Sequence, residues 1–257
     1  NGNFDAVHLH YDQYSDIMSH INCDKKLITS HYPNLENPEP QYLFLYDLLK
    51  NSGAHIVCLS DRIEKEFVNR GCDSTNVSIL PCGIDVDLYS IDEDDVLYPD
   101  RSVVVGKIEP RKRQAFLQHK GLCIDFIGNN SDINFDSSDP CYFGEQSKQD
   151  IMDNLTSYAN MVLLSSGEAH PFVCLEGMAA GLGLVLSEQS TANLDLNKPF
   201  ITVIPDNKLN DTDYLKEKIK ENREISLTMR KDIRQYCKDN FDWCVIMNKY
   251  KDIIEKI

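Results

Sequence analysis

Short runs of apolar residues rich in Val, Ile and Leu recur along the chain, and segments with helical periodicity lie between several of them. The runs are continuous rather than alternating, which is typical of strands buried on both faces of a parallel sheet that helices cover. The pattern therefore predicts the α/β class. The predicted strands are His55–Leu59, Ser102–Val105, Leu122–Ile127, Met161–Leu164, Leu182–Leu186 and Phe200–Ile204.

Three segments have the features of helices. Ser60 can cap a helix over Asp61–Arg70, whose apolar residues share one face. Tyr42–Lys50 is predicted as a second, strongly apolar helix. Tyr214–Asn240 is long and charged with spaced apolar positions, and we expect it to break near Glu224–Ser226.

A stretch dominated by Asp and Glu separates two α/β segments, and it has no clear periodicity. We therefore place an interdomain linker at residues 91–100. A first domain is expected at residues 1–90 and a second at residues 101–242, followed by a C-terminal helix at residues 243–257.

Charge and cysteine content narrow the possible functions. The 257 residues include 26 Lys and Arg against 41 Asp and Glu, so the net charge of −15 disfavours nucleic acids and anionic lipid surfaces as partners. The apolar runs are far shorter than the roughly 20 residues of a membrane span. Nine cysteines, an odd number without a CxxC pair, are interpreted as reduced thiols in a cytoplasmic protein.

The densest positive charge lies in the segment VVVGKIEPRKRQ, directly after a predicted strand. Gly106 ends that strand, and Lys107, Arg111, Lys112 and Arg113 follow it. Because ligands bind at the carboxyl ends of parallel strands, these cations could hold a phosphate or a diphosphate leaving group. The alternative is a solvated basic turn that balances nearby acids.

Two carboxylates form the second candidate constellation, in the segment SSGEAHPFVCLEGMAAG. Glu168 lies in a predicted strand-to-helix loop, and Glu176 lies one to two turns into a helix that begins at Phe172 and ends at Gly181. Both could border one cleft and accept hydrogen bonds from sugar or ribose hydroxyls. The alternative is a surface loop charge and a helix residue near a favourable dipole end.

Together these motifs resemble those of the retaining glycosyltransferases of family 4, over about Phe4 to Tyr250. The resemblance implies the GT-B fold, with two Rossmann-like parallel-sheet domains. It also implies that the N-terminal, acceptor-side domain is abbreviated or that residues upstream of it are missing. The matching segments, in chain order, are FDAVHLH, ITSHYP, IVCLSD, ILPCGIDVDLY, VGKIEPRKR, FIGNN, CYFGEQS, EAHPFVCLE and NFDWCVIMNKY.

The resemblance implies a role for each matching residue. Lys107 and Lys112 take the positions of the arginine and lysine that grip the donor diphosphate, while the E-x7-E motif places Glu168 on the transferred sugar and Glu176 on the ribose hydroxyls. The donor-binding residues implied are Gly106, Lys107, Lys112, Gly128, Glu168, His170, Pro171, Phe172 and Glu176.

Several positions depart from the family pattern. Pro171 replaces a glycine of the usual GFG segment and has no backbone N–H to offer a sugar hydroxyl. Cys82 replaces an Asn and Tyr89 a Phe in the segment ILPCGIDVDLY. Lys107 keeps the charge of the family's arginine without its bidentate fork.

Three histidines have two possible interpretations. His10 takes the position of the second His in the family's HxH strand, which implies a catalytic role beside the acceptor, or it could bond a local backbone carbonyl. His31 has the same two interpretations. For His170 we favour a packing role in its loop, with a sugar contact as the alternative.

The resemblance predicts an enzyme of the hexosyltransferase type, with Glu168, His10, Lys107 and Lys112 as its catalytic residues. It would transfer a sugar from a nucleotide diphosphate sugar, with retention, to a hydroxyl of a glycan, a lipid or a small molecule. No metal ion and no other cofactor is expected. The alternatives are a catalytically silent sugar-nucleotide-binding or scaffold subunit and another GT-B enzyme such as a sugar-nucleotide epimerase.

Overall fold

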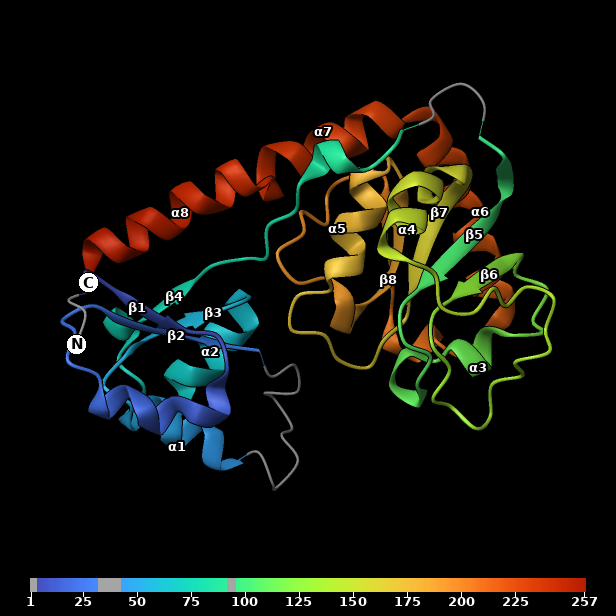
Figure 1. Ribbon diagram of the computed structural model, residues 1–257. Coiled ribbons are helices and arrows are strands. Elements are labelled where there is room, and N and C mark those ends of the chain that lie inside the picture. The colour runs from blue at the N-terminus through green and yellow to red at the C-terminus, as the bar shows by residue number, and fades with distance from the viewer. Residues whose placement is uncertain (1–3, 32–42, 92–95) are drawn as a thin grey trace. The chain divides into compact units, whose positions relative to one another are not determined.

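The computed structural model describes residues 4–31, 43–91 and 96–257 (Figure 1). Part of the predicted linker, residues 92–95, and Tyr42 of a predicted helix lie outside these ranges. The last three residues of the predicted linker belong to a strand instead, because β5 runs from Tyr98 to Val105.

The chain forms two compact units. Unit 1 comprises Asn1–Gly83, Glu168–His170 and Trp243–Ile257, and unit 2 comprises Ile84–Gly167 and Pro171–Asp242. Unit 1 is therefore assembled from three separate parts of the sequence. The domain boundaries expected from the sequence stay predictions.

Unit 1 contains a four-stranded parallel sheet in the order β1-β2-β3-β4. Buried Ile28 and Ile56 face a core that also includes Phe67, while their neighbours Leu27 and Val57 face the opposite side. This alternation buries both faces of the sheet. The strands are β1 (Val7–Leu9), β2 (Lys26–Ser30), β3 (His55–Cys58) and β4 (Val77–Ile79).

Helices cover both faces of this sheet (Figure 1). One face is covered by the 3-10 helix η1 and by α1 and α2, and the other by α8, whose Ile253 packs on Leu27 and Val57. The predicted cap of α2 is confirmed, because Ser60 Oγ accepts a hydrogen bond from the Ile63 N–H. These elements are η1 (Asp12–His20), α1 (Leu43–Asn51), α2 (Asp61–Asn69) and α8 (Trp243–Lys256).

Unit 2 contains a five-stranded parallel sheet in the order β6-β5-β7-β8-β9. The strands match the apolar runs of the sequence, which confirms the predicted α/β class. They are β5 (Tyr98–Val105), β6 (Ile124–Ile127), β7 (Tyr158–Leu163), β8 (Gly183–Ser187) and β9 (Ile201–Ile204). The helices of unit 2 are α3 (Gln114–Leu117), α4 (Lys148–Asn154), α5 (Phe172–Ala179), α6 (Thr212–Thr228) and α7 (Arg230–Phe241).

The break between α6 and α7 lies at Met229, later than the predicted break near Glu224–Ser226. Ser226 continues the helix because its hydroxyl is buried and bonded to the sheet, accepting from the Gly183 N–H at 2.7 Å. Asn222, one turn earlier, is also fully buried and donates to Thr202 Oγ1 at 3.0 Å. Ser226 and Asn222 therefore attach α6 to β8 and β9.

We expect Gly128→Ala to lower the free energy of unfolding by about 3 kcal/mol. Gly128 has a φ of +148°, and a Cβ there would lie 2.0 Å from the Gly106 carbonyl oxygen. Urea denaturation measures the change. Gly121→Ala is the matched control, because Gly121 has a φ of +65° with open space around its Cβ position, so only about 1 kcal/mol is expected. Equal losses in the two variants would contradict this account.

Candidate functional site

The order of the strands in the unit 2 sheet reverses once, between β5 and β7. From β5 the chain moves to β6 on one side and then to β7 on the other side of β5. The loops that follow β5 and β7 therefore leave the sheet in opposite directions, and ligands of parallel α/β sheets bind at such a switch point. The two motifs selected from the sequence follow these two strands.

The loop after β5 brings Gly106 and Lys112 together. Gly106 has a φ of +129°, and a Cβ built on it would lie 2.9 Å from Lys112 Nζ, so the ammonium lies against the backbone of the glycine. Lys107 is exposed in the same loop, and its carbonyl accepts a hydrogen bond from Gln114 at 3.0 Å. Among the described residues, neither lysine ammonium has a hydrogen-bond or ion-pair partner.

Arg111 joins the loop after β5 to the loop after β7. Its guanidinium donates to Ser165 Oγ at 3.0 Å and to the Gly167 carbonyl, and the Arg111 carbonyl accepts from the Ser166 N–H at 2.9 Å. Glu109 Oε1 accepts from the same guanidinium at 2.7 Å. The basic segment thus contains both structural arginines and unpaired lysines, and sequence reasoning gave Arg111 no separate role.

The loop after β6 lies against the loop after β5. The Gly106 N–H donates to the Ile127 carbonyl at 2.9 Å, and the Ile108 N–H donates to the Asn129 carbonyl at 2.8 Å. Gly128 is the contact point, because no side chain fits between it and Gly106. Beside this contact is a hollow of about 380 Å³, lined by residues that include Gly106, Lys107, Gly128, Asn129 and Glu145.

The two glutamates of the E-x7-E motif lie in different units. Glu168 is half-buried and belongs to unit 1, whereas Glu176 is buried in α5 of unit 2. The helix begins where the sequence predicts, after Pro171 as N-cap, and Phe172 is its first residue, with 40% of its surface exposed. That both carboxylates border one cleft stays a prediction.

Glu176 is held by two residues that sequence reasoning did not assign to the site. Tyr89 Oη donates to Glu176 Oε1 at 2.9 Å, and Lys148 Nζ contacts the same oxygen. Lys148 Nζ also donates to Tyr89 Oη at 2.7 Å and lies 5.1 Å from the centre of the Phe172 ring. Burial and the neighbouring carboxylate raise the pKa of Tyr89.

Lys148 had one local signal in the sequence. It follows Ser147, which forms a capping box with Asp150, so Lys148 is the first residue of α4. A cation in the first turn of a helix is disfavoured by the helix dipole, which suggests that another group holds it. The sequence does not indicate that Tyr89 and Glu176 are its partners, because both are distant from Lys148 along the chain.

His170 lies in a buried position, and its role in packing or in sugar binding stays a prediction. It is buried, and its Nδ1 accepts a hydrogen bond from the Cys82 N–H at 2.9 Å, so the neutral ring carries its proton on Nε2. Burial lowers the pKa of His170 to about 4.

Three histidines lie together at the carboxyl ends of β1 and β2 in unit 1. The ring centre of His8 is 4.0 Å from that of His10, and that of His10 is 6.3 Å from that of His31. His8 bonds Tyr250 Oη at 2.9 Å and Thr29 Oγ1 at 2.7 Å. Burial, reinforced by the two neighbouring histidines, lowers the pKa of His8 to about 4.

His10 and His31 are the exposed members of this group. Although part of the His31 side chain is exposed, partial desolvation of its ring lowers its pKa, and the carboxylate of Asp12 opposes that change. The sequence identified the two exposed histidines but not His8, whose position two residues before His10 places both rings on one face of β1.

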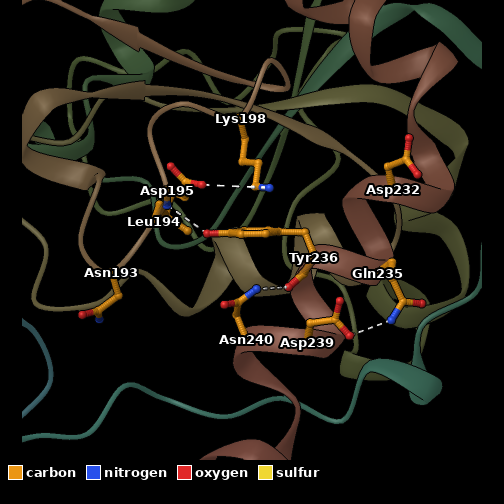
Figure 2. A pocket seen from close by; sticks show the side chains of 9 residues that line it. All are labelled: Asn193, Leu194, Asp195, Lys198, Asp232, Gln235, Tyr236, Asp239 and Asn240. Carbon is orange, nitrogen blue, oxygen red and sulfur yellow. Dashed lines mark hydrogen bonds and ion pairs between the residues drawn. The ribbon is translucent and has the colours of Figure 1, made fainter.

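A second hollow, of about 490 Å³, lies between the segment after β8 and helix α7 (Figure 2). The ring of Tyr236 lies across it, with Lys198 Nζ 5.4 Å from the ring centre. Tyr236 Oη accepts from the Asp195 N–H at 2.9 Å, and Gln235 donates to Asp239 at 2.7 Å. The contacts of Tyr236 with Asp195 and Lys198 attach the segment to α7, whereas the Gln235–Asp239 bond lies within that helix.

No group of three or more His, Cys, Asp and Glu residues in residues 4–31, 43–91 and 96–257 could hold a metal ion. No helix in these ranges is long and apolar enough to cross a bilayer.

Comparison with solved structures identifies the fold. No protein-family model matches the sequence, and no curated protein matches it. The chain is similar to Anabaena HepE in complex with UDP-glucose, with a TM-score of 0.76 at 13% identity, covering 98% of this chain and 79% of HepE. The chain has the GT-B fold.

Two other solved structures support the same fold. Sucrose-phosphate synthase from Thermosynechococcus elongatus has a TM-score of 0.75 at 15% identity, covering 98% of this chain and 73% of that chain. The apo form of the lipopolysaccharide outer core galactosyltransferase WaaB has a TM-score of 0.71 at 14% identity, covering 97% of this chain and 74% of that chain. Both similarities extend through the two units.

The buried His170 should make folding sensitive to acid. Its pKa falls from 6.5 to about 4 on folding, so between these values the unfolded chain binds a proton that the native chain does not. The free energy of unfolding should therefore fall as the pH falls through this range, by up to about 1.4 kcal/mol per pH unit from this residue.

Urea denaturation of wild type and His170→Asn between pH 7 and pH 4 measures this contribution. The Asn side-chain oxygen can still accept from the Cys82 N–H, but it does not titrate. The variant should lose less stability on acidification than wild type does. An identical pH dependence in the two proteins would show that His170 is protonated equally in both states.

Proposed function

We propose that this chain is a retaining glycosyltransferase of family 4, which transfers a hexose-type sugar from a nucleotide diphosphate sugar to a hydroxyl group. The observation that carries the proposal is the pair of unpaired ammonium groups at the switch point of the unit 2 sheet, Lys107 and Lys112 beside Gly106. The similarity to HepE, whose structures contain UDP and UDP-glucose, supports the same donor class.

In the proposed reaction the bond between the anomeric carbon and the diphosphate breaks, and a bond from the acceptor oxygen forms on the same face of the sugar. The leaving diphosphate gains negative charge, which Lys107 and Lys112 stabilise. The motif assigns Glu168 to the transferred sugar and Glu176 to the ribose hydroxyls. Gly106 and Gly128 allow close approach of phosphate oxygens because they present no side chain.

On the acceptor side we assign His10 as the group that receives the proton of the acceptor hydroxyl when its oxygen bonds to the anomeric carbon. It is exposed at the end of β1, and its neighbour His8 is fixed by Tyr250 and Thr29. The acceptor itself, a glycan, a lipid or a small molecule, is not selected by these residues. For His170 we propose a packing role, since its Nδ1 is bonded to the Cys82 N–H.

We propose that the reaction needs no metal ion, because the lysines supply the positive charge that a divalent cation would bring to a diphosphate. We also propose that the protein is located in the reducing environment of the cytoplasm, which is consistent with its nine free cysteines.

The first test is nucleotide binding. UDP, GDP and ADP and their sugars should each be added in a thermal-shift assay, and at least one should raise the melting temperature of the wild-type chain. Lys112→Ala should weaken that binding by about tenfold, because one charge-assisted contact to phosphate is lost. Lys220→Ala, on the exposed face of α6, is the control. If no nucleotide stabilises the wild type, the donor assignment is wrong.

The second test is turnover. Donor hydrolysis or transfer should fall by a factor of about 100 or more in Glu168→Ala while nucleotide affinity is kept, since the proposed contact is to the sugar. Treatment with EDTA should leave the wild-type rate unchanged. A chain that binds nucleotide but shows no turnover with any donor would instead be a catalytically silent binding subunit.

A further inference from the structure

Glu176 lies at the meeting point of three segments of unit 2. It is in the second turn of α5, Lys148 is the first residue of α4, and Tyr89 follows the 3-10 helix η4 (Val86–Leu88). The two donors reach the same carboxylate oxygen, Oε1, and they also bond each other, since Lys148 Nζ donates to Tyr89 Oη at 2.7 Å. The three polar groups therefore form a closed triangle.

The exposure of the two charged residues is unequal. The side chain of Glu176 is 11% exposed, whereas that of Lys148 is 56% exposed. A carboxylate this buried loses most of its hydration, which hydrogen-bond donors must replace, whereas the lysine could be fully hydrated elsewhere. The arrangement thus serves the carboxylate more than the lysine.

The position of Lys148 is further evidence that the three-residue cluster stabilises the Glu176 carboxylate. The lysine stands in the first turn of α4, where the helix dipole disfavours a cation, although the same turn has a capping box of Ser147 and Asp150. Tyr89 stands where the resembled pattern has Phe, and only the tyrosine has a hydroxyl to donate. Lys148 is therefore unfavourable for the stability of α4, and Tyr89 differs from the resembled pattern. Each of these two residues supplies a hydrogen-bond donor to Glu176.

We propose that Lys148 and Tyr89 are positioning residues that hold Glu176 Oε1 and so leave Oε2 as the acceptor for the vicinal ribose hydroxyls of the donor. The inference rests on the proposed function, which places a nucleoside diphosphate on unit 2. A carboxyl group fixed through one oxygen presents the other at a defined angle, and this lowers the entropic cost of ordering the side chain when the ligand binds. A freely rotating side chain would lack that advantage.

The experiment compares Lys148→Met with wild type against pairs of ligands that differ only in the ribose. The probes are UDP, GDP and ADP, each beside its 2′,3′-dideoxy counterpart, with calorimetry as the readout and the melting temperature as a check of folding. Lys148→Met should lower affinity for the natural nucleotide about tenfold and affinity for the dideoxy nucleotide less than about twofold. Tyr89→Phe should show the same selectivity with a loss of about threefold.

Two controls separate positioning from other roles. Lys148→Arg keeps the cation and should restore affinity for the natural nucleotide to within about threefold of wild type. Lys220→Met changes an exposed lysine of α6 and should leave both affinities unchanged.

Each other result overturns the proposal in a different way. Equal losses for the natural and dideoxy nucleotides would place Lys148 on the phosphates or in the scaffold, and unchanged affinities would show that Glu176 needs no positioning. If the wild type binds none of the six nucleotides, the proposed function fails first and the inference fails with it. Wild-type binding without ribose discrimination would overturn the inference alone.

Discussion

The arrangement of unit 2 depends on the close approach of two glycine backbones. Gly128 lies so near the Gly106 carbonyl that a Cβ would overlap it, and backbone hydrogen bonds on both sides keep the two loops together. Arg111 holds the other side of the same loop to the segment after β7. The loop after β5 is thereby fixed between its neighbours, and its lysines project from a rigid backbone. Such preorganisation is what electrostatic stabilisation of a leaving group requires.

In unit 1, hydrogen bonds to a buried histidine orient the cluster of His8, His10 and His31. Both ring nitrogens of His8 form hydrogen bonds, one to Thr29 of β2 and one to Tyr250 of α8. The His8 ring is therefore fixed in place, and it contacts the ring of the exposed His10. Because burial keeps His8 neutral through most of the pH range, it adds no charge beside its neighbour.

The fold was predictable from the sequence because strands that are buried on both faces leave continuous apolar runs, and Ser60 and Gly181 mark helix ends locally. The break near Ser226 was misplaced because the sequence does not show that a polar side chain bonds to the sheet rather than to solvent. Lys107, Lys112 and Glu176 were selected by their motifs, and their roles in the site stay predictions. Lys148 and His8 were not selected, and Arg111 was named only as one of four candidate cations, because the partners of these three residues on other elements are brought to them only by folding.

The discontinuous sequence of unit 1 limits how the molecule can be divided. A polypeptide that stopped at Gly83 would contain every strand of the four-stranded sheet, yet Leu27 and Val57 would have no Ile253 to cover them. The Cys82 N–H would also lack the imidazole that accepts from it. Dissection into separately expressed halves would thus leave the first half with an uncovered apolar face, a surface prone to aggregation, and co-expression of the pieces would be needed to rebuild it.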